Sequence, residues 1–511
     1  MPVSPADLVL AVDVGTTATK VTAFAVDGTP VAAAEHGYPL HAPQPGHAEQ
    51  DPEEILGAAV TALADVVAQV GAVRVAGLAF SAAMHTLMAL DGEGRPLTAL
   101  TSWADTRAEP QADRLRADPS GLALHRRTGT PVHSMSPLPR LLWFAEHEPG
   151  LCARASRWCG IKEYLLLRLC GAWVMDHSIA SAAGLMNLEA LDWDQEALQL
   201  ATIEPTQLPA LVPTTHVETL TAAAARDLGL PAGTPVVVGG GDGPLANLGV
   251  GAVRPGMAAC SLGTSGALRV VVDRPAVDPQ GRVFCYALAP GLWVVGGAIN
   301  NGGIVMRWAL ESLAPDLGPG AEEDLLALAA QVPPGSSGLL MVPSLLSERA
   351  PRWTSLARGS YVGLTREHRR EHMVRAAIEG VALQLALVLE SMRATGLEVR
   401  EVRATGGVMR SELWQQLLAD AFDMPIDLPQ GQQGSGYGAA ILGMAALGLI
   451  DTIADAATPP VVRSVPPAPD AAAVYAALRP IFSGLDDALA PTFAALRRAD
   501  LSARAVVRPG T

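Results

Sequence analysis

A turn of glycine and threonine that occurs twice, each time directly after a run of β-forming residues, constrains the fold of this chain most. The first turn is Gly15-Thr16-Thr17, and the second is Gly263-Thr264-Ser265-Gly266. The two turns are separated by nearly half of the 511 residues. A chain of this length is too long for one ordinary core, and two domains of about 250 residues are the natural expectation. The sequence therefore predicts an internal duplication into two similar halves.

The first turn has the composition of a phosphate-binding hairpin. Gly15 allows the backbone to approach a ligand closely, while backbone N–H groups and the hydroxyls of Thr16 and Thr17 can donate to phosphate oxygens. Asp13 is expected at the end of the preceding strand, facing the turn, where a carboxylate can hold Mg²⁺ or its waters. Taken alone, such a motif also occurs in ordinary hairpins whose Gly and Thr serve only the turn. The residues of this turn leave both interpretations open.

The composition is that of a well-packed protein rather than a disordered one, with 49% hydrophobic and 17% charged residues. The formal net charge of −15 and the lack of a Lys/Arg-rich run argue against nucleic acid and anionic membranes as partners. The amino terminus lacks the basic and apolar regions of a signal peptide, and the apolar run Ala439–Ile450 is too short to span a membrane. A cytoplasmic location is therefore expected. Five cysteines without a CxxC pair favour free thiols over disulfides or a zinc site.

Local signals predict alternating strands and helices, which is typical of an α/β fold. A helix should begin at Asp51 and Pro52, because Asp favours the N-cap and Pro the first helical position, and should run through Val67. In the first half we also expect a strand at Val73–Phe80, a helix at Thr221–Leu228 and a strand from Pro235 into Gly239-Gly-Gly-Asp242. In the second half we expect strands near 257–270 and 283–297, helices near 300–312, 322–331 and 368–395, a strand at Val402–Gly407 and a helix at Ser411–Asp420.

The predicted domain organisation has three parts. Residues 1–250 form an N-terminal domain, 251–457 a C-terminal domain, and 458–511 a Pro-rich linker, a C-terminal helix and a tail. The linker is assigned to Pro459–Pro469 because of its proline content.

Lysine is rare, since only Lys20 and Lys162 are lysines among the 36 Lys and Arg residues. If the Arg bias reflects genome composition, these two positions need a compact ammonium that the planar Arg fork does not reproduce. Chance retention is the alternative.

Several blocks of the sequence resemble the FGGY family of carbohydrate kinases across about residues 8–450. Gly359–Glu379 is similar to the second family signature, and Ser136–Trp143 is similar to the first, with Arg140 where a lysine is usual. Glu49–Pro52, Glu348–Pro351 and Gly239–Asp242 also resemble family blocks. The resemblance implies an α/β fold of two duplicated actin-like, ribonuclease H-like domains, with ATP and a sugar in the cleft between them.

The resemblance also assigns roles to individual residues. Asp242 is the candidate general base, although an isolated GGGD is more often a turn capped by its Asp. Asp13 is the candidate Mg²⁺ residue. The candidate nucleotide-binding residues are Gly15, Thr16, Thr17, Lys20, Gly263, Thr264, Ser265, Gly303, Gly406, Gly407 and Ser411.

Within the family, the nearest resemblance is to gluconate kinases, through blocks that are spread over both halves. The candidate substrate-binding residues in these blocks are Ser81, Met84, His85, Trp103, Asp105, Arg107, Lys162, Asp176, His177 and Asn301. Gluconate carries a carboxylate and a polyol chain, so cations can bind one end while carboxylates and amides bind the hydroxyls. Each residue alone is more often structural, and only the joint pattern indicates a site.

The resemblance therefore implies an ATP-dependent gluconate kinase that produces 6-phosphogluconate. One alternative is a kinase for xylulose or another pentulose or polyol, because the phosphate machinery is shared. A second is a nucleotide-dependent regulator or ATPase that uses the same fold without sugar transfer. The expected partners are the sugar acid and ATP. A homodimer is an open alternative to a monomer.

Overall fold

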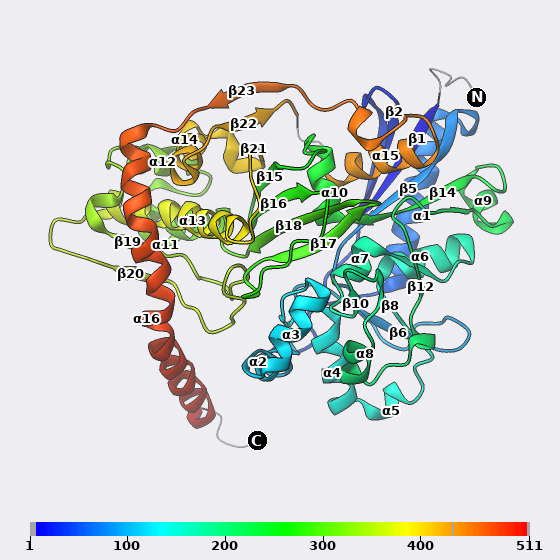
Figure 1. Ribbon diagram of the computed structural model, residues 1–511, viewed down its shortest axis with the longest axis horizontal. Helices are drawn as coiled ribbons and strands as arrows, with labels where there is room; N and C mark the ends of the chain where they lie inside the picture. Colours follow the sequence, from blue (N-terminus) through cyan, green and yellow to red (C-terminus); the bar gives the residue numbers. More distant parts are fainter. Residues whose placement is uncertain (1–6, 432–433, 508–511) are drawn as a thin grey trace. The chain divides into compact units, whose positions relative to one another are not determined.

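The computed structural model describes residues 7–431 and 434–507 and divides into two compact units that are interleaved in the sequence. The first unit contains the described residues up to Met257, together with Arg269–Val295 and Gly431–Pro460. The second contains Ala258–Leu268, Gly296–Gln430 and the chain from Val461 onward. Strands and helices alternate in both units (Figure 1), so the predicted α/β class is confirmed. The predicted sequence boundaries at 250 and 457 stay a prediction.

The first unit is built on a six-stranded sheet with the order β13-β14-β5-β1-β2-β3. Its strands are β1 (Leu8–Val14), β2 (Ala18–Ala25), β3 (Pro30–Gly37), β5 (Val75–Ala82), β13 (Val217–Thr219) and β14 (Pro235–Gly241). β1 is antiparallel to β2 and parallel to β5, which in turn is parallel to β14. The carboxyl ends of β1, β5 and β14 therefore share one edge, which is where open α/β sheets carry their ligand sites.

Helix α1 (Pro52–Val70) covers this sheet next to β2 and β3 and forms where the sequence predicts. Asp51 caps it by accepting a hydrogen bond from the Glu53 N–H at 2.8 Å, and Gly71 ends it three residues beyond the predicted end. Its apolar positions, including Ile55, Leu63 and Val66, are buried against the sheet, as expected for an amphipathic helix. The predicted helix after Thr221 is α9 (Ala222–Leu228), which ends at Gly229.

Helix α15 (Ser435–Ala446) contains most of the apolar run Ala439–Ile450, and it packs on α10 (Asp242–Gly249). A Cβ atom at Gly438 would lie 2.0 Å from the carbonyl oxygen of Leu245. Glycine is therefore required for this close approach of the two helices.

Short elements extend from the sheet of the first unit and carry most of the predicted substrate residues. The strands are β4 (Glu49–Gln50), β6 (Met88–Leu90), β7 (Leu100–Thr101), β8 (Arg157–Cys159), β9 (Val174–Asp176), β10 (Met186–Asn187), β11 (Asp192–Trp193) and β12 (Ala210–Val212). The helices are α2 (Glu109–Ala117), α3 (Pro119–Thr128), α4 (Pro137–His147), α5 (Pro149–Cys152), α6 (Ile161–Cys170), α7 (His177–Ser181) and α8 (Gln195–Ala201).

A seven-stranded sheet has the order β17-β18-β16-β15-β21-β22-β23. Its strands are β15 (Met257–Leu262), β16 (Gly266–Val272), β17 (Phe284–Ala289), β18 (Leu292–Ile299), β21 (Glu401–Thr405), β22 (Ile426–Pro429) and β23 (Val461–Val465), and a separate pair consists of β19 (Leu340–Val342) and β20 (Ser360–Val362). The helices of the second unit are α11 (Gly303–Leu313), α12 (Glu322–Ala330), α13 (Arg370–Arg393), α14 (Glu412–Phe422) and α16 (Pro469–Val507).

The assignment of Pro459–Pro469 to a linker is wrong at its centre. Val461–Val465 forms the edge strand β23, antiparallel to β22. Its β-branched valines favour a strand, and the prolines lie outside it or at an edge, where no ladder hydrogen bond is lost.

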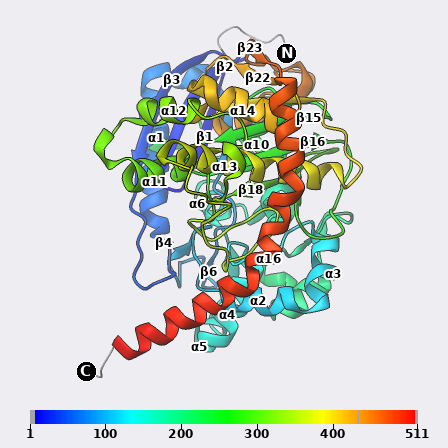
Figure 2. The same ribbon diagram turned by 90° about the vertical axis from the view of Figure 1, so that its left-hand side faces the viewer.

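Helix α13 forms the centre of the second unit, and α16 runs along it and along α14 (Figure 2). Glu379 of α13 accepts hydrogen bonds from Arg375 Nε and from the Tyr475 hydroxyl of α16, both at 2.7 Å. In the described part of the chain, α13 is the one helix long and apolar enough to cross a membrane, and 89% of its most apolar window is buried within the protein. Burial of this kind is typical of a core helix.

Candidate active site

The first Gly-Thr turn joins β1 and β2 and is supported by side chains from three distant segments. The Tyr38 hydroxyl donates to the Gly15 carbonyl at 2.7 Å, and Gln50 Nε2 donates to the Thr16 carbonyl at 2.8 Å. Trp103 Nε1 donates to the Thr16 hydroxyl at 2.9 Å. These three donors fix two backbone carbonyls and one hydroxyl of the turn, while Thr17 is exposed.

Asp13 stands at the end of β1, as predicted, beside Ser81 of the parallel strand β5. Its Oδ2 accepts a hydrogen bond from Ser435 Oγ at 2.8 Å, whereas Oδ1 is buried and accepts none from the described residues. Burial raises the pKa of Asp13, against the smaller opposing effects of the nearby Ser81 and Ser435 hydroxyls and of Lys20. Asp13 and Lys20 line a cavity of about 300 Å³ together with residues of β2 and the start of α15.

Asp242 is the first residue of α10, directly after β14. The register of β14 against β5 shifts between Val237 and Gly240, where Gly239 has a φ of 71° and a Cβ atom would lie 1.7 Å from the Phe80 carbonyl oxygen. Only glycine fits this bulge, which sets the direction of the chain into Asp242. Burial raises the pKa of Asp242 to about 6, and the Asp13 carboxylate adds to the rise. The two carboxylates are thus electrostatic neighbours.

A buried guanidinium organises the loop that carries Met84 and His85. Arg140 is fully buried and donates to the carbonyls of His85 and Ser102, to the Met135 carbonyl and to the Thr101 hydroxyl. His85 has a φ of 63°, a conformation that costs energy for a residue with a side chain. The bond from Arg140 helps to hold it. Burial lowers the pKa of Arg140 to about 9.

The predicted residues Asp105 and Arg107 form one ion-paired group with Glu49, in which Asp105 is buried. Arg107 donates to the Asp105 carboxylate, with Nε 2.9 Å from Oδ1, and also pairs with Glu49. Asp105 Oδ2 accepts a further bond from the Ala48 N–H at 2.9 Å. The Arg107 guanidinium also lies 5.0 Å from the ring centroid of Trp143. Asp105 therefore orients Arg107 and the loop before β4.

Lys162 and Asp176 form an ion pair whose side chains are 1% and 0% exposed. Asp176 also caps α7, because its Oδ1 accepts bonds from the N–H groups of Ser178 and Ile179. His177, the first residue of α7, is half-buried, and burial lowers its pKa.

The second Gly-Thr turn joins β15 and β16 and lies in the second unit. The N–H of Gly303, at the start of α11, donates to the Gly263 carbonyl at 2.7 Å, and the N–H of Gly302 donates to the Thr264 carbonyl at 3.2 Å. A Cβ atom at Gly302 would lie 2.7 Å from the carbonyl carbon of Ser265. The structure thus brings the predicted residues Gly263, Thr264, Ser265 and Gly303 together.

Gly406 meets the same turn from the end of β21. It has a φ of 110°, and a Cβ atom there would lie 2.2 Å from the Leu262 carbonyl oxygen. Gly407 begins the short 3₁₀ helix that follows, and Ser411 caps α14 by accepting a bond from the Trp414 N–H at 3.5 Å. Ser411 therefore has a structural role in the helix N-terminus.

Asn301 is the one predicted substrate residue that belongs to the second unit, and its amide is occupied within that unit. Its Nδ2 donates to Glu348 Oε2 at 2.8 Å and to the Leu346 carbonyl, while its Oδ1 accepts from the Leu346 N–H at 2.9 Å. Glu348 also accepts from the Asn300 N–H, and burial raises the pKa of Glu348. The Asn301 amide therefore stabilises the segment before α11, and its hydrogen bonds are made within the protein.

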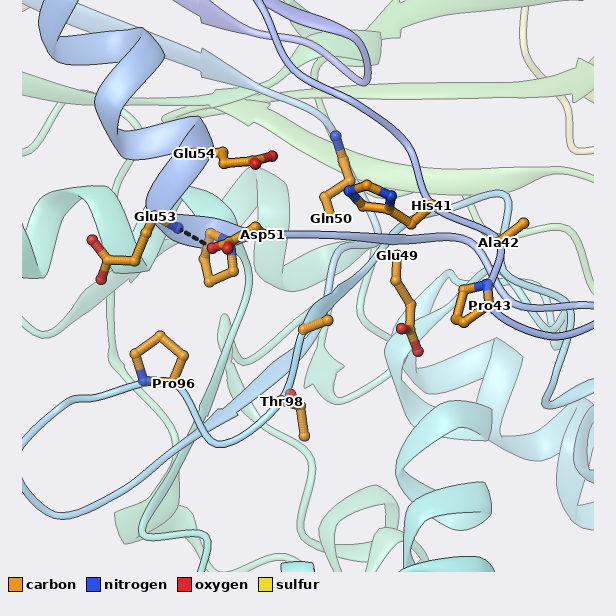
Figure 3. A pocket seen from close by; sticks show the side chains of 12 residues that line it. His41, Ala42, Pro43, Glu49, Gln50, Asp51, Glu53, Glu54, Pro96 and Thr98 are labelled. Atoms are coloured by element: carbon orange, nitrogen blue, oxygen red, sulfur yellow. Dashed lines mark hydrogen bonds between the residues drawn. The ribbon is translucent and has the colours of Figure 1, made fainter.

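A hollow of about 830 Å³ in the first unit does not coincide with the predicted residues (Figure 3). Its lining includes His41, Glu49, Asp51, Glu53 and Pro96. Asp51 serves as the cap of α1, and Glu49 pairs with Arg107. The hollow therefore borders the segment around Gln50, which supports the first turn.

Three residues of this region are not among the predicted site residues. Arg269 on β16 lies beside α10, because a Cβ atom at Gly243 would be 3.2 Å from its Nη2, and its charge opposes the rise in the Asp242 pKa. A single Arg between the buried residues Leu268 and Val270 was a usable signal. The other two are Tyr38 and Gln50, which support the first turn. Gln50 lies within a block that resembles the family, whereas nothing in the sequence marks Tyr38.

Comparison with known proteins identifies both parts of the chain. Residues 8–249 match the N-terminal domain of the FGGY family of carbohydrate kinases, and residues 258–447 match its C-terminal domain. A gluconokinase of Bacillus subtilis is 41% identical over 93% of this chain and 95% of its own length. A xylulose kinase of Staphylococcus epidermidis is 30% identical over 88% of this chain and 89% of its own length.

Solved structures agree with these matches. A gluconate kinase from Lactobacillus acidophilus superposes with a TM-score of 0.92 at 34% identity, covering 96% of this chain and 99% of that one. A ligand-bound xylulose kinase from the same organism gives a TM-score of 0.92 at 35% identity, covering 96% of this chain and all of that one. The predicted two-domain fold is confirmed, and the chain belongs to the FGGY family of carbohydrate kinases.

Proposed function

We propose that this kinase transfers the γ-phosphoryl group of ATP to the terminal hydroxyl of D-gluconate, giving 6-phospho-D-gluconate and ADP. The observation that carries the proposal is the 41% identity to a gluconokinase over 95% of that protein's length, against 30% for a xylulose kinase. This difference in whole-length identity favours gluconate. Because substrate choice depends on few residues, the substrate is tested directly below.

Asp242 is the proposed general base. It accepts the proton of the sugar hydroxyl while the bond from that oxygen to the γ-phosphorus forms and the bond from this phosphorus to the β,γ-bridging oxygen breaks. ADP leaves, and Asp242 then releases its proton to solvent. A pKa of about 6 leaves the carboxylate ionised at neutral pH and still basic enough to accept a proton.

Asp13 is the proposed Mg²⁺ residue, and its surroundings fit that ion. Its Oδ1 is buried and accepts no hydrogen bond from the described residues. The described part of the chain contains no group of three His, Cys, Asp or Glu residues suited to a metal, which agrees with an ion held by one carboxylate, waters and substrate phosphates. When bound, Mg²⁺ would neutralise charge on the phosphates.

Each of the two turns is a proposed phosphate-binding element within its own unit. The residues concerned are Gly15, Thr16, Thr17 and Lys20 of the first unit, and Gly263, Thr264, Ser265, Gly303, Gly406 and Gly407 of the second. Backbone N–H groups at glycine turns suit phosphate oxygens, because no side chain blocks the approach.

A kinase for xylulose is the second candidate, because the Lactobacillus acidophilus xylulose kinase superposes as well as the gluconate kinase does. The test is ADP release with mass detection of the product, using gluconate, xylulose, ribulose, glycerol and no sugar. Preference for gluconate with a phosphogluconate product supports the proposal, and preference for xylulose supports the second candidate. ADP release without a phosphorylated sugar would contradict both.

A further inference from the structure

The buried pair of Lys162 and Asp176 has a geometry that does not suit sugar binding. Both side chains are almost completely enclosed, at 1% and 0% exposure, and the ammonium is already neutralised by the Asp176 carboxylate. An ammonium in this state offers neither free charge nor access to a substrate carboxylate. Lys162 is a predicted substrate-binding residue and one of two lysines in the chain. Its enclosed position requires another explanation for why a lysine stands here.

Asp176 passes the constraint to α7. While its Oδ2 contacts Lys162, its Oδ1 accepts bonds from the N–H groups of Ser178 at 2.9 Å and Ile179 at 3.0 Å. Lys162 thus orients the capping carboxylate through their ion pair. The neighbouring Glu163, also buried, uses one carboxylate oxygen to accept the Gly160 N–H at 2.9 Å.

Helix α7 in turn holds the chain that leads into Asp242. The Ser178 hydroxyl accepts a hydrogen bond from the Gly241 N–H at 3.2 Å, and a Cβ atom at Gly240 would lie 3.2 Å from Ser178 Cβ. On its other side, a Cβ atom at Gly241 would lie 2.7 Å from Met84 Cγ. Gly241 therefore contacts both Ser178 and Met84, and a side chain at this position would clash with Met84.

We propose that Lys162 is a positioning residue for the Asp242 carboxylate, acting through Asp176, α7 and Gly241, and does not bind the sugar. The inference rests on the proposed role of Asp242 as the base. Every link in the chain from Lys162 to Gly241 is a contact between buried groups of the first unit. A small displacement of Asp242 reduces the rate because the base must meet the hydroxyl at hydrogen-bond distance.

The test compares K162M and S178A with the wild type in steady-state kinetics with gluconate and ATP. We expect K162M to lower kcat about 10- to 100-fold and S178A about 3- to 10-fold, each with the KM for gluconate changed less than about threefold. A tenfold or larger rise in the KM for gluconate at nearly unchanged kcat in K162M would overturn the proposal, because that is the result expected of a carboxylate ligand.

The pH profile separates positioning from a loss of folded protein. A lower fraction of folded enzyme reduces kcat without moving the midpoint of its acid limb. Burial is the main cause of the raised pKa of Asp242, and Asp13 and Arg269 are unchanged in the variants, so we expect a displaced carboxylate to shift the midpoint of the acid limb. An unmoved midpoint in both variants contradicts the proposal.

Two further measurements complete the design. If thermal unfolding shows that K162M does not fold, the kinetics of S178A alone test the proposal. Removing one hydroxyl leaves no buried charge unpaired, so S178A should fold. Wild-type kinetics in S178A would then overturn the proposal. D242N distinguishes the proposed role of Asp242 as the base from the proposed positioning role of Lys162. An inactive D242N with wild-type S178A refutes only the positioning role, whereas an active D242N refutes the base and the positioning role together.

Discussion

The two Gly-Thr turns have similar sequences, yet their supports differ in kind. The first turn receives three side-chain donors, from Tyr38, Gln50 and Trp103, in addition to a backbone bond from the Tyr38 N–H to the Thr17 carbonyl at 3.0 Å. The second is held by backbone, because Gly302, Gly303 and Gly406 approach it too closely for any side chain. Loss of one side-chain donor removes one hydrogen bond, whereas a Cβ atom at a backbone contact displaces the whole segment. Substitutions should therefore have graded effects at the first turn and abrupt effects at the second.

The largest effect is expected at Gly406. In G406A the new Cβ atom would meet the Leu262 carbonyl oxygen at 2.2 Å, at a φ of 110° that alanine rarely adopts. We expect the free energy of unfolding to fall by about 2–4 kcal/mol and kcat/KM for ATP to fall at least about 100-fold. Thermal unfolding and initial rates measure the two effects.

The matched control is G396A, which also places alanine at a positive φ, 81°, but in open space. Its loss of stability should be about 1 kcal/mol, with the KM for ATP unchanged. Equal kinetic effects of the two variants would show that backbone strain alone, and not contact with the turn, is responsible.

The second comparison concerns the residue two positions before each turn, which is Asp13 in the first and Ser261 in the second. D13N should lower kcat about 10²- to 10³-fold, because the proposed Mg²⁺ carboxylate is lost. It should also shift the acid limb of kcat/KM to lower pH. The Asp13 charge helps to raise the pKa of Asp242 to about 6, so a neutral amide lets that pKa fall.

Rates measured from pH 5 to 8 test both parts of this prediction. Wild-type activity should rise with pH through about 6, since the base must lose its proton. S261A serves as the control and should stay within about threefold of the wild type. An acid limb in D13N that does not move would contradict the electrostatic coupling of Asp13 to Asp242.

Sequence reasoning located the elements of the site well because their signals are local. The N-cap at Asp51, the helix end at Leu228 and the strand into Asp242 depend on neighbouring residues, and all three are confirmed. The partners of buried charges depend on segments far apart in the chain. Nothing near Lys162 identifies Asp176 as its counter-charge, and nothing near Asn301 identifies Glu348.

Arg140 provides a test of how far the first turn depends on its surroundings. The guanidinium donates to the carbonyls of His85 and Ser102, and Ser102 precedes Trp103, which supports the turn. In R140K the charge remains, but an ammonium has three donors without the planar fork. We expect the KM for the sugar to rise about 10-fold and the KM for ATP about threefold. Equal and large increases in the KM for the sugar and the KM for ATP would indicate that the first turn and the loop carrying Met84 and His85 depend equally on Arg140.

The smallest effect, and the sharpest test of graded support, is expected for W103F. The change removes the bond from Nε1 to the Thr16 hydroxyl and keeps an aromatic ring in place. One neutral hydrogen bond contributes about 0.5–1.5 kcal/mol, so the KM for ATP should rise about two- to tenfold with kcat little changed. W193F is the matched control, because Trp193 Nε1 donates to the Pro209 carbonyl away from the turn, and it should lower stability without changing the KM for ATP. A hundredfold loss in W103F would mean that the first turn is as intolerant as the second, and the contrast between side-chain and backbone support would then be wrong.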